Sequence, residues 1–210
     1  MGQRPETTVR ELAAVDPDGW ESATWPGFLQ FVADGSLPRS AFDRWLGQDR
    51  LFVEGLARTW ARLLVRAPTS DLPLLADGIA AFAAEVTWLE EVAGGRGLVL
   101  PVPALPPTAE YLAHLDRMAE APLPVALASM WAVEAIYLEA WSRAAPGAPE
   151  YRPFVEHWTS GAFADFVDHL ETAADVALAV APETELVAAE VVIGRTVDLE
   201  IAFWSMAQDV

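Results

Sequence analysis

Glu134 lies in a helical segment that is otherwise almost entirely apolar. The segment ALASMWAVEAIYLEAW, residues 126–141, contains one other charged residue, Glu139. The neighbours of Glu134 at helical spacing are bulky and apolar, so its carboxyl group would be desolvated and its pKa would tend to rise. Such a group can act as a general acid or base or bind a polar ligand. It can equally be a buried Glu that only hydrogen-bonds a tyrosine, a Trp N–H or an Arg, and both interpretations stand.

The same pattern recurs at Glu200 and Asp49. Glu200 shares a helical face with apolar residues that include Trp204, whereas Asp198 points elsewhere. Asp49 also faces apolar neighbours, and Arg50 lies about 100° around the helix, so it is not an obvious ion-pair partner. For each carboxylate alone, a structural role is the simpler interpretation. Three of them on separate apolar helices predict a shared interior pocket.

The tyrosines and histidines offer fewer candidates. Tyr111 and Tyr137 fall on apolar helical faces, where a hydroxyl needs a hydrogen-bond partner, while Tyr151 lies in a proline-rich segment and is expected to be structural. Asp165 and His169 are one helical turn apart, a spacing that could place two metal ligands on one face. The matching Glu and Glu-x-x-His sets of a di-iron bundle are missing, so we expect no metal.

The composition argues against several classes of function. The chain has 31 acidic and 13 basic residues, a net charge of -18, and no Cys. Because an acidic surface repels phosphate backbones and anionic lipid, we expect neither a nucleic acid nor a membrane as partner. The lack of Cys excludes disulfides and a cysteine nucleophile. The start of the chain does not resemble a signal peptide and no apolar run reaches transmembrane length, so we expect a cytoplasmic protein.

Helical periodicity dominates the chain and nothing alternates like a strand. With 53% hydrophobic residues the chain can bury a sizeable core, and we predict one all-α domain over residues 1–210. We expect Gly94-Gly95 to end one helix and Thr108 to cap the next. The proline-rich ranges 98–107 and 146–153 are predicted loops. The expected helices cover about residues 38–65, 71–93, 108–118, 125–141, 161–180 and 182–209.

Taken in order, these segments resemble the TenA family, also called the thiaminase II family. The resemblance begins with FVADGSLP at residues 31–38 and continues through W-L-x-Q-D at 45–49 and Tyr111. It then takes in the helix at 130–141, residues 157–163 and E-x-x-F-W at 200–204. It covers roughly residues 20–208 and implies a haem-oxygenase-like helical bundle.

The resemblance also implies a pocket for the aminopyrimidine half of thiamin or its breakdown products. Asp49 stands at the position of the residue that binds the pyrimidine, and Tyr111 at that of a pocket tyrosine. Phe52 matches an aromatic residue that stacks on the ring, and Trp158 replaces a further pocket tyrosine. Glu200 corresponds to the carboxylate thought to act on the departing group.

One departure from the family pattern changes the expected chemistry. Familiar members have a cysteine nucleophile two residues before the helix tryptophan, where this chain has Ser129. The stretch MWAVEAIY resembles instead the class that lacks this cysteine. We include Ser129 and Tyr137 among the substrate-binding residues, but Ser129 has no base evident from the sequence and is not a predicted nucleophile. Glu134 or Glu200 would activate water and then protonate the departing amine, without a metal or cofactor.

The leading hypothesis is therefore a cofactor-independent hydrolase of thiamin-derived aminopyrimidines in thiamin salvage. It would be an aminopyrimidine aminohydrolase or a formylaminopyrimidine amide hydrolase. A non-catalytic binder of a pyrimidine-like metabolite is the first alternative. A regulatory protein is the second, although the net charge argues against direct contact with DNA. Because members of the family usually assemble, we also expect a homo-oligomer.

Overall fold

The structure, a computed structural model, describes residues 7–208, and within this range the chain forms helices joined by turns and loops, without strands. Most of the helices are long, and the shorter ones lie near the N-terminus and directly after the second proline-rich segment. Their order is α1 (Val9–Ala13), α2 (Pro17–Thr24), α3 (Gly27–Asp34), α4 (Arg39–Leu64), α5 (Leu72–Arg96), α6 (Pro106–Glu120), α7 (Leu123–Arg143), α8 (Arg152–Trp158), α9 (Gly161–Ala179) and α10 (Glu183–Met206).

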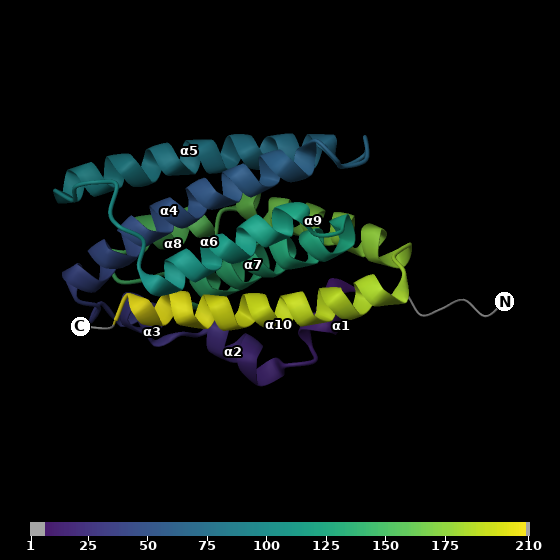
Figure 1. Cartoon of the computed structure of the whole chain (residues 1–210). Coiled ribbons are helices and arrows are strands. Elements are labelled where there is room, and N and C mark those ends of the chain that lie inside the picture. The colour runs from purple at the N-terminus through teal and green to yellow at the C-terminus, as the bar shows by residue number, and fades with distance from the viewer. Residues whose placement is uncertain (1–6, 209–210) are drawn as a thin grey trace.

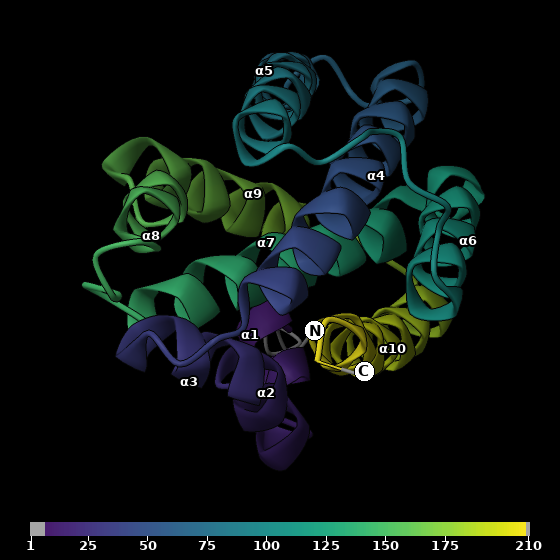
Figure 2. The ribbon, with the colours of Figure 1, turned by 90° about the vertical axis from the view of Figure 1, so that its left-hand side faces the viewer.

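Helices α4 and α7 form the centre of the bundle. Helix α4 packs along α5 and α6, and α7 packs along α9 and α10, while α1 and α2 contact both α7 and α10. Figure 1 shows α5 on the outside of the bundle beside α4, and the end view of Figure 2 shows α4 crossing α7. Because α7 has neighbours on several sides, its sequence is apolar almost all around, as its residues 126–141 indicate.

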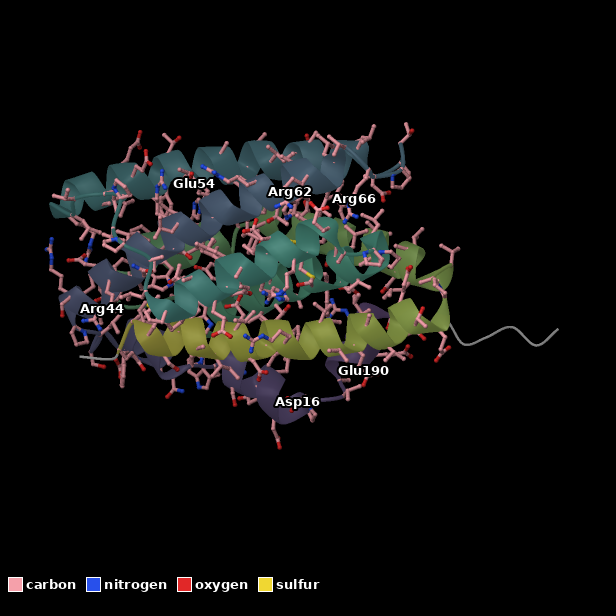
Figure 3. The ribbon with its side chains drawn as sticks, in the orientation of Figure 1. Asp16, Arg44, Glu54, Arg62, Arg66 and Glu190 are labelled. Atoms are coloured by element: carbon pink, nitrogen blue, oxygen red, sulfur yellow. The ribbon has the colours of Figure 1, made fainter. Side chains whose placement is uncertain are left out.

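Arginines join neighbouring helices on the surface. Arg62 of α4, labelled in Figure 3, pairs with Asp116 of α6 at 3.0 Å. Arg50 of α4 pairs with Glu90 of α5 at 2.6 Å, so it does not neutralise the adjacent Asp49, as its position around the helix predicted. An exposed pair such as Arg62–Asp116 contributes little stability by itself.

Two predicted helix boundaries are wrong. Gly94-Gly95 does not end α5, because the helix continues to Arg96 and ends at Gly97, whose φ of 78° is the left-handed conformation that glycine adopts readily. Thr108 is not the N-cap of α6, which begins two residues earlier at Pro106. The first turn of a helix tolerates proline because its N–H groups have no intrahelical partner.

The predicted loop at 146–153 also overlaps a helix, because α8 begins at Arg152 with Pro153 in its first turn. Tyr151, just before it, is buried and donates a hydrogen bond to the carbonyl of Leu37 at 2.9 Å, in keeping with the structural role expected for it. Helices α1, α2 and α3 were not predicted. The expected end of the last helix at Asp209 lies outside the described residues, and α10 ends at Met206.

Helices α5 and α7 are long and apolar enough to cross a membrane, judged by length and composition alone. The sequence pattern had indicated no such run. The apolar window of α7 is 72% buried inside the protein, as for a core helix, whereas that of α5 is 22% buried.

Candidate active site

A small cavity with three acidic residues in its wall lies where α4, α5, α7, α8 and α9 meet. Asp49 comes from α4, Glu85 from α5 and Glu134 from α7. The cavity volume is about 20 Å³, room for roughly one water molecule. The rest of the wall is apolar or aromatic and consists of Phe52, Val53, Leu56, Phe82, Val133, Tyr137, Trp158 and Phe163.

Asp49 is fully buried and only half satisfied. The hydroxyl of Tyr137 donates a hydrogen bond to its Oδ1 at 2.8 Å, while Oδ2 has no partner among the described residues. Burial raises the pKa of Asp49 well above its ordinary value, and the nearby charge of Glu85 adds to the effect. The prediction that Tyr137 needs a partner is confirmed, and that partner is Asp49.

Glu134 is buried, and its Oε1 has no hydrogen-bond partner among residues 7–208. Burial raises the pKa of Glu134 well above its ordinary value, and the charges of Glu85, Glu200 and Asp49 raise it further. Burial without a hydrogen-bond donor favours the protonated form of this carboxyl group. It can therefore donate a proton to a ligand in the cavity.

Glu200 is also buried, but it does not form part of the cavity wall. The hydroxyl of Tyr111 donates to its Oε1 at 2.6 Å, and Oε2 has no partner within the described chain. Burial raises the pKa of Glu200 to about 8. The ring of Phe52, which does line the cavity, lies 4.5 Å from the ring of Tyr111, so the Tyr111–Glu200 pair lies next to the wall rather than in it.

Ser129 does not occupy the place predicted for it. It lies outside the cavity wall, and its Oγ is 3.0 Å from both His114 Nε2 and Thr196 Oγ1. The physical reason is helical geometry, because five residues turn the helix so that Ser129 is about 140° from Glu134. Burial lowers the pKa of His114 to about 4, so the imidazole is neutral. The three side chains form a buried polar cluster beside α6 and α10.

Glu85 is the site residue that sequence reasoning missed. Trp158 Nε1 donates to its Oε1 at 2.7 Å, and His157 Nε2 lies 4.0 Å from the same oxygen. Burial raises the pKa of Glu85 to about 7. The sequence does contain a pattern that could have identified it, since Glu85 is the one charged residue between Ile79 and Leu89. This is the pattern that identified Glu134.

A larger groove lies outside the cavity, between α5 and the α8–α9 pair. Its volume is about 1130 Å³, and Phe82, Glu85, Trp158 and Phe163 line both spaces. The pair considered above as metal ligands, Asp165 and His169, lines this outer groove. In the described part of the chain no three acidic or His side chains come together in a way that could hold a metal ion.

Fold and site together define a haem-oxygenase-like helical bundle with carboxyl groups around an interior cavity. The TENA/THI-4/PQQC family matches residues 20–210, and the chain belongs to this family. The chain is 26% identical over 202 residues to a soybean (Glycine max) protein described as a "Probable bifunctional TENA-E protein", covering 90% of this chain and 88% of that one.

Solved structures show the same fold. A TenA homologue from Pyrococcus furiosus superposes with a TM-score of 0.90 at 25% identity, covering 94% of this chain and 98% of that one. A protein from Silicibacter sp. TM1040, described as a TenA family transcription regulator, gives a TM-score of 0.86 at 18% identity, covering 98% and 99%.

Proposed function

We propose that this protein hydrolyses a carbon–nitrogen bond in a thiamin-derived aminopyrimidine, without a cofactor. The observation that carries the proposal is a pair of buried carboxyl oxygens beside one cavity, Asp49 Oδ2 and Glu134 Oε1, neither of which has a hydrogen-bond partner among residues 7–208. Leaving such acceptors buried without donors is costly, so the site favours a ligand that is rich in N–H groups. An aminopyrimidine presents ring and exocyclic nitrogens with that character. Membership of the TenA family and the relation to a TENA-E protein support the same class of substrate.

In this reaction Asp49 holds the ring and Phe52 supplies an aromatic face for stacking. A water oxygen forms a bond to the carbon that carries the departing nitrogen. The C–N electron pair leaves with that nitrogen, which takes a proton from Glu134. The proton lost by the water returns to the carboxylate. Glu200, polarised by Tyr111, is the second candidate for the proton-accepting role.

The cavity has room for roughly one water molecule and is therefore too small to take a pyrimidine ring as well. The ring therefore enters by displacing part of the wall that the cavity shares with the outer groove. Phe82 and Phe163 belong to that wall and are the side chains expected to move. Closure of this wall over the substrate would exclude bulk water.

The direct test is to incubate the protein with the aminopyrimidine and the formylaminopyrimidine and to follow release of ammonia and formate. Glu134→Gln is expected to reduce kcat by about a hundredfold or more, because Gln cannot transfer a proton. Glu139→Gln is the matched control on the same helix, since Glu139 is exposed. Ligand-induced thermal stabilisation without turnover by the parent protein would instead support a non-catalytic binder.

A further inference from the structure

Glu85 reaches the cavity from a helix at the edge of the bundle. Helix α5 lies along α4 on the outside (Figure 1), and Glu85 belongs both to the cavity wall and to the groove. Its side chain is 18% exposed, whereas Glu134 is almost completely covered at 4%. Of the two carboxyl groups, Glu85 therefore has the better contact with solvent.

The hydrogen bonds of Glu85 and Glu134 also favour the negative charge on Glu85. Glu85 accepts a hydrogen bond from Trp158 Nε1, and an indole N–H can only donate, so the bond favours the carboxylate form. Glu134 Oε1 receives no such bond from the described residues. Three carboxyl groups line this small apolar cavity, and a state in which all of them are charged is disfavoured. Asp49 and Glu85 each accept a hydrogen bond, from Tyr137 and Trp158, so of the three Glu134 is the group that keeps its proton most easily. The first negative charge therefore belongs on Glu85, and the proton stays on Glu134.

We propose that Glu85 is a positioning residue that acts through Glu134, by taking the negative charge of the pair so that Glu134 keeps its proton. This role in catalysis rests on the proposed function, whereas the pairing of the two groups does not. Glu85 itself need not touch the substrate. Its contribution is to hold Glu134 in the acid form that protonates the departing nitrogen.

Other titratable groups surround the pair, and none of them supplies the missing donor to Glu134 Oε1. On α9 the titratable side chains Asp165 and His169 face the outer groove rather than the cavity. The groups on the remaining helices are Asp49 of α4, Tyr111 of α6, Tyr137 of α7, His157 of α8 and Glu200 of α10.

The kinetic test uses Glu85→Gln, which keeps an oxygen acceptor for Trp158 but removes the charge. Without that charge Glu134 loses its proton more easily, so the alkaline limb of the kcat–pH profile should move to lower pH by about one unit. Glu85→Asp retains a carboxylate and should restore the parent profile in large part. Glu91→Gln, an exposed position on the same helix, is the control and should leave the profile unchanged.

Infrared titration tests the pairing without any turnover. The carbonyl stretch of a protonated carboxyl group that disappears in Glu134→Gln identifies Glu134. In Glu85→Gln this band should disappear at a lower pH than in the parent protein. If the band disappears at the same pH or at a higher one, the pairing of Glu85 with Glu134 is overturned. If the parent hydrolyses no aminopyrimidine yet the band shifts as expected, the proposed function fails and the pairing stands. The parent protein could instead hydrolyse the substrate while Glu85→Gln changes neither the alkaline limb of the kcat–pH profile nor the pH at which the infrared band disappears. That result would overturn the proposed role of Glu85.

Discussion

One carboxyl oxygen of Asp49 accepts a hydrogen bond from Tyr137, and the other has no partner among the described residues. Replacing Asp49 by Asn therefore changes the hydrogen-bonding groups in the cavity while nearly preserving the shape of the cavity. Asn would present an N–H where an aminopyrimidine also presents one. We expect Asp49→Asn to weaken binding of the aminopyrimidine by about tenfold or more, because a ligand N–H would lose its buried oxygen acceptor. Calorimetric titration at fixed pH measures the change. Asp198→Asn, at an exposed site, is the control, and equal affinities for the parent and Asp49→Asn would contradict the assignment.

Ser129 provides the opposite test, because its hydroxyl is engaged by His114 and Thr196 away from the cavity. We expect Ser129→Ala to keep kcat/KM within about threefold, since Ser129 does not line the cavity. The free energy of unfolding should fall by about 1–2 kcal/mol, because a buried donor or acceptor loses its partner. Chemical denaturation and steady-state kinetics separate the two effects. A loss of activity without a loss of stability would return Ser129 to the site.

At the scale of the helices, the contact between α5 and α4 depends on Gly78. A Cβ at this position would lie 2.8 Å from two ring atoms of Trp60, a side chain that is fully buried. Gly78→Ala should therefore separate α5 from α4 and destabilise the protein by about 1–3 kcal/mol, despite the better helix propensity of Ala. At Gly94, within the same helix, a Cβ would meet no atom within 4 Å, so Gly94→Ala should be neutral or stabilising by up to about 1 kcal/mol. Thermal unfolding compares the two variants with the parent protein. Equal changes in Tm for Gly78→Ala and Gly94→Ala would mean that the close packing at Gly78 is unimportant.

The long helices could be predicted because each presents an extended apolar pattern, and α4, α7 and α9 lie within about two residues of their predicted bounds. Helix α8 could not, because its seven residues begin beside a proline and depend on burial of Phe154 and Trp158. Short helices of this kind are stabilised by tertiary packing rather than by propensity.

The sequence predicted only those features of the site that can be recognised from a residue and its neighbours on the same helix. Asp49 and Glu134 stand out as acids within apolar helices, and Glu85 would have done so by the same criterion. The tyrosine that satisfies Asp49 lies 88 residues away in the sequence, and the one that satisfies Glu200 lies 89 residues away. Such pairings are set by how helices pack, so no local spacing could predict them.

For the whole molecule, the buried carboxyl groups determine how stability depends on pH. The pKa of Glu85 is raised from 4.5 to about 7 and that of Glu200 to about 8, in both cases chiefly by burial. The folded protein therefore keeps protons that the unfolded chain releases near 4.5. The resulting stabilisation is fully present below that pH and is lost as the pH rises through about 7 and 8.

We expect the free energy of unfolding to fall between about pH 5 and about pH 8, by several kcal/mol in total, because one pKa unit corresponds to about 1.4 kcal/mol. Urea denaturation at a series of pH values measures the slope.

The general repulsion of a chain with net charge -18 also increases over this range. The two causes are separated by Glu200→Gln, which keeps an acceptor for Tyr111 but cannot ionise, so its slope should be shallower. Asp198→Asn removes one charge from an exposed site and should keep the parent slope. Parallel curves for all three proteins would show that overall charge, and not the buried carboxyl group, controls the dependence.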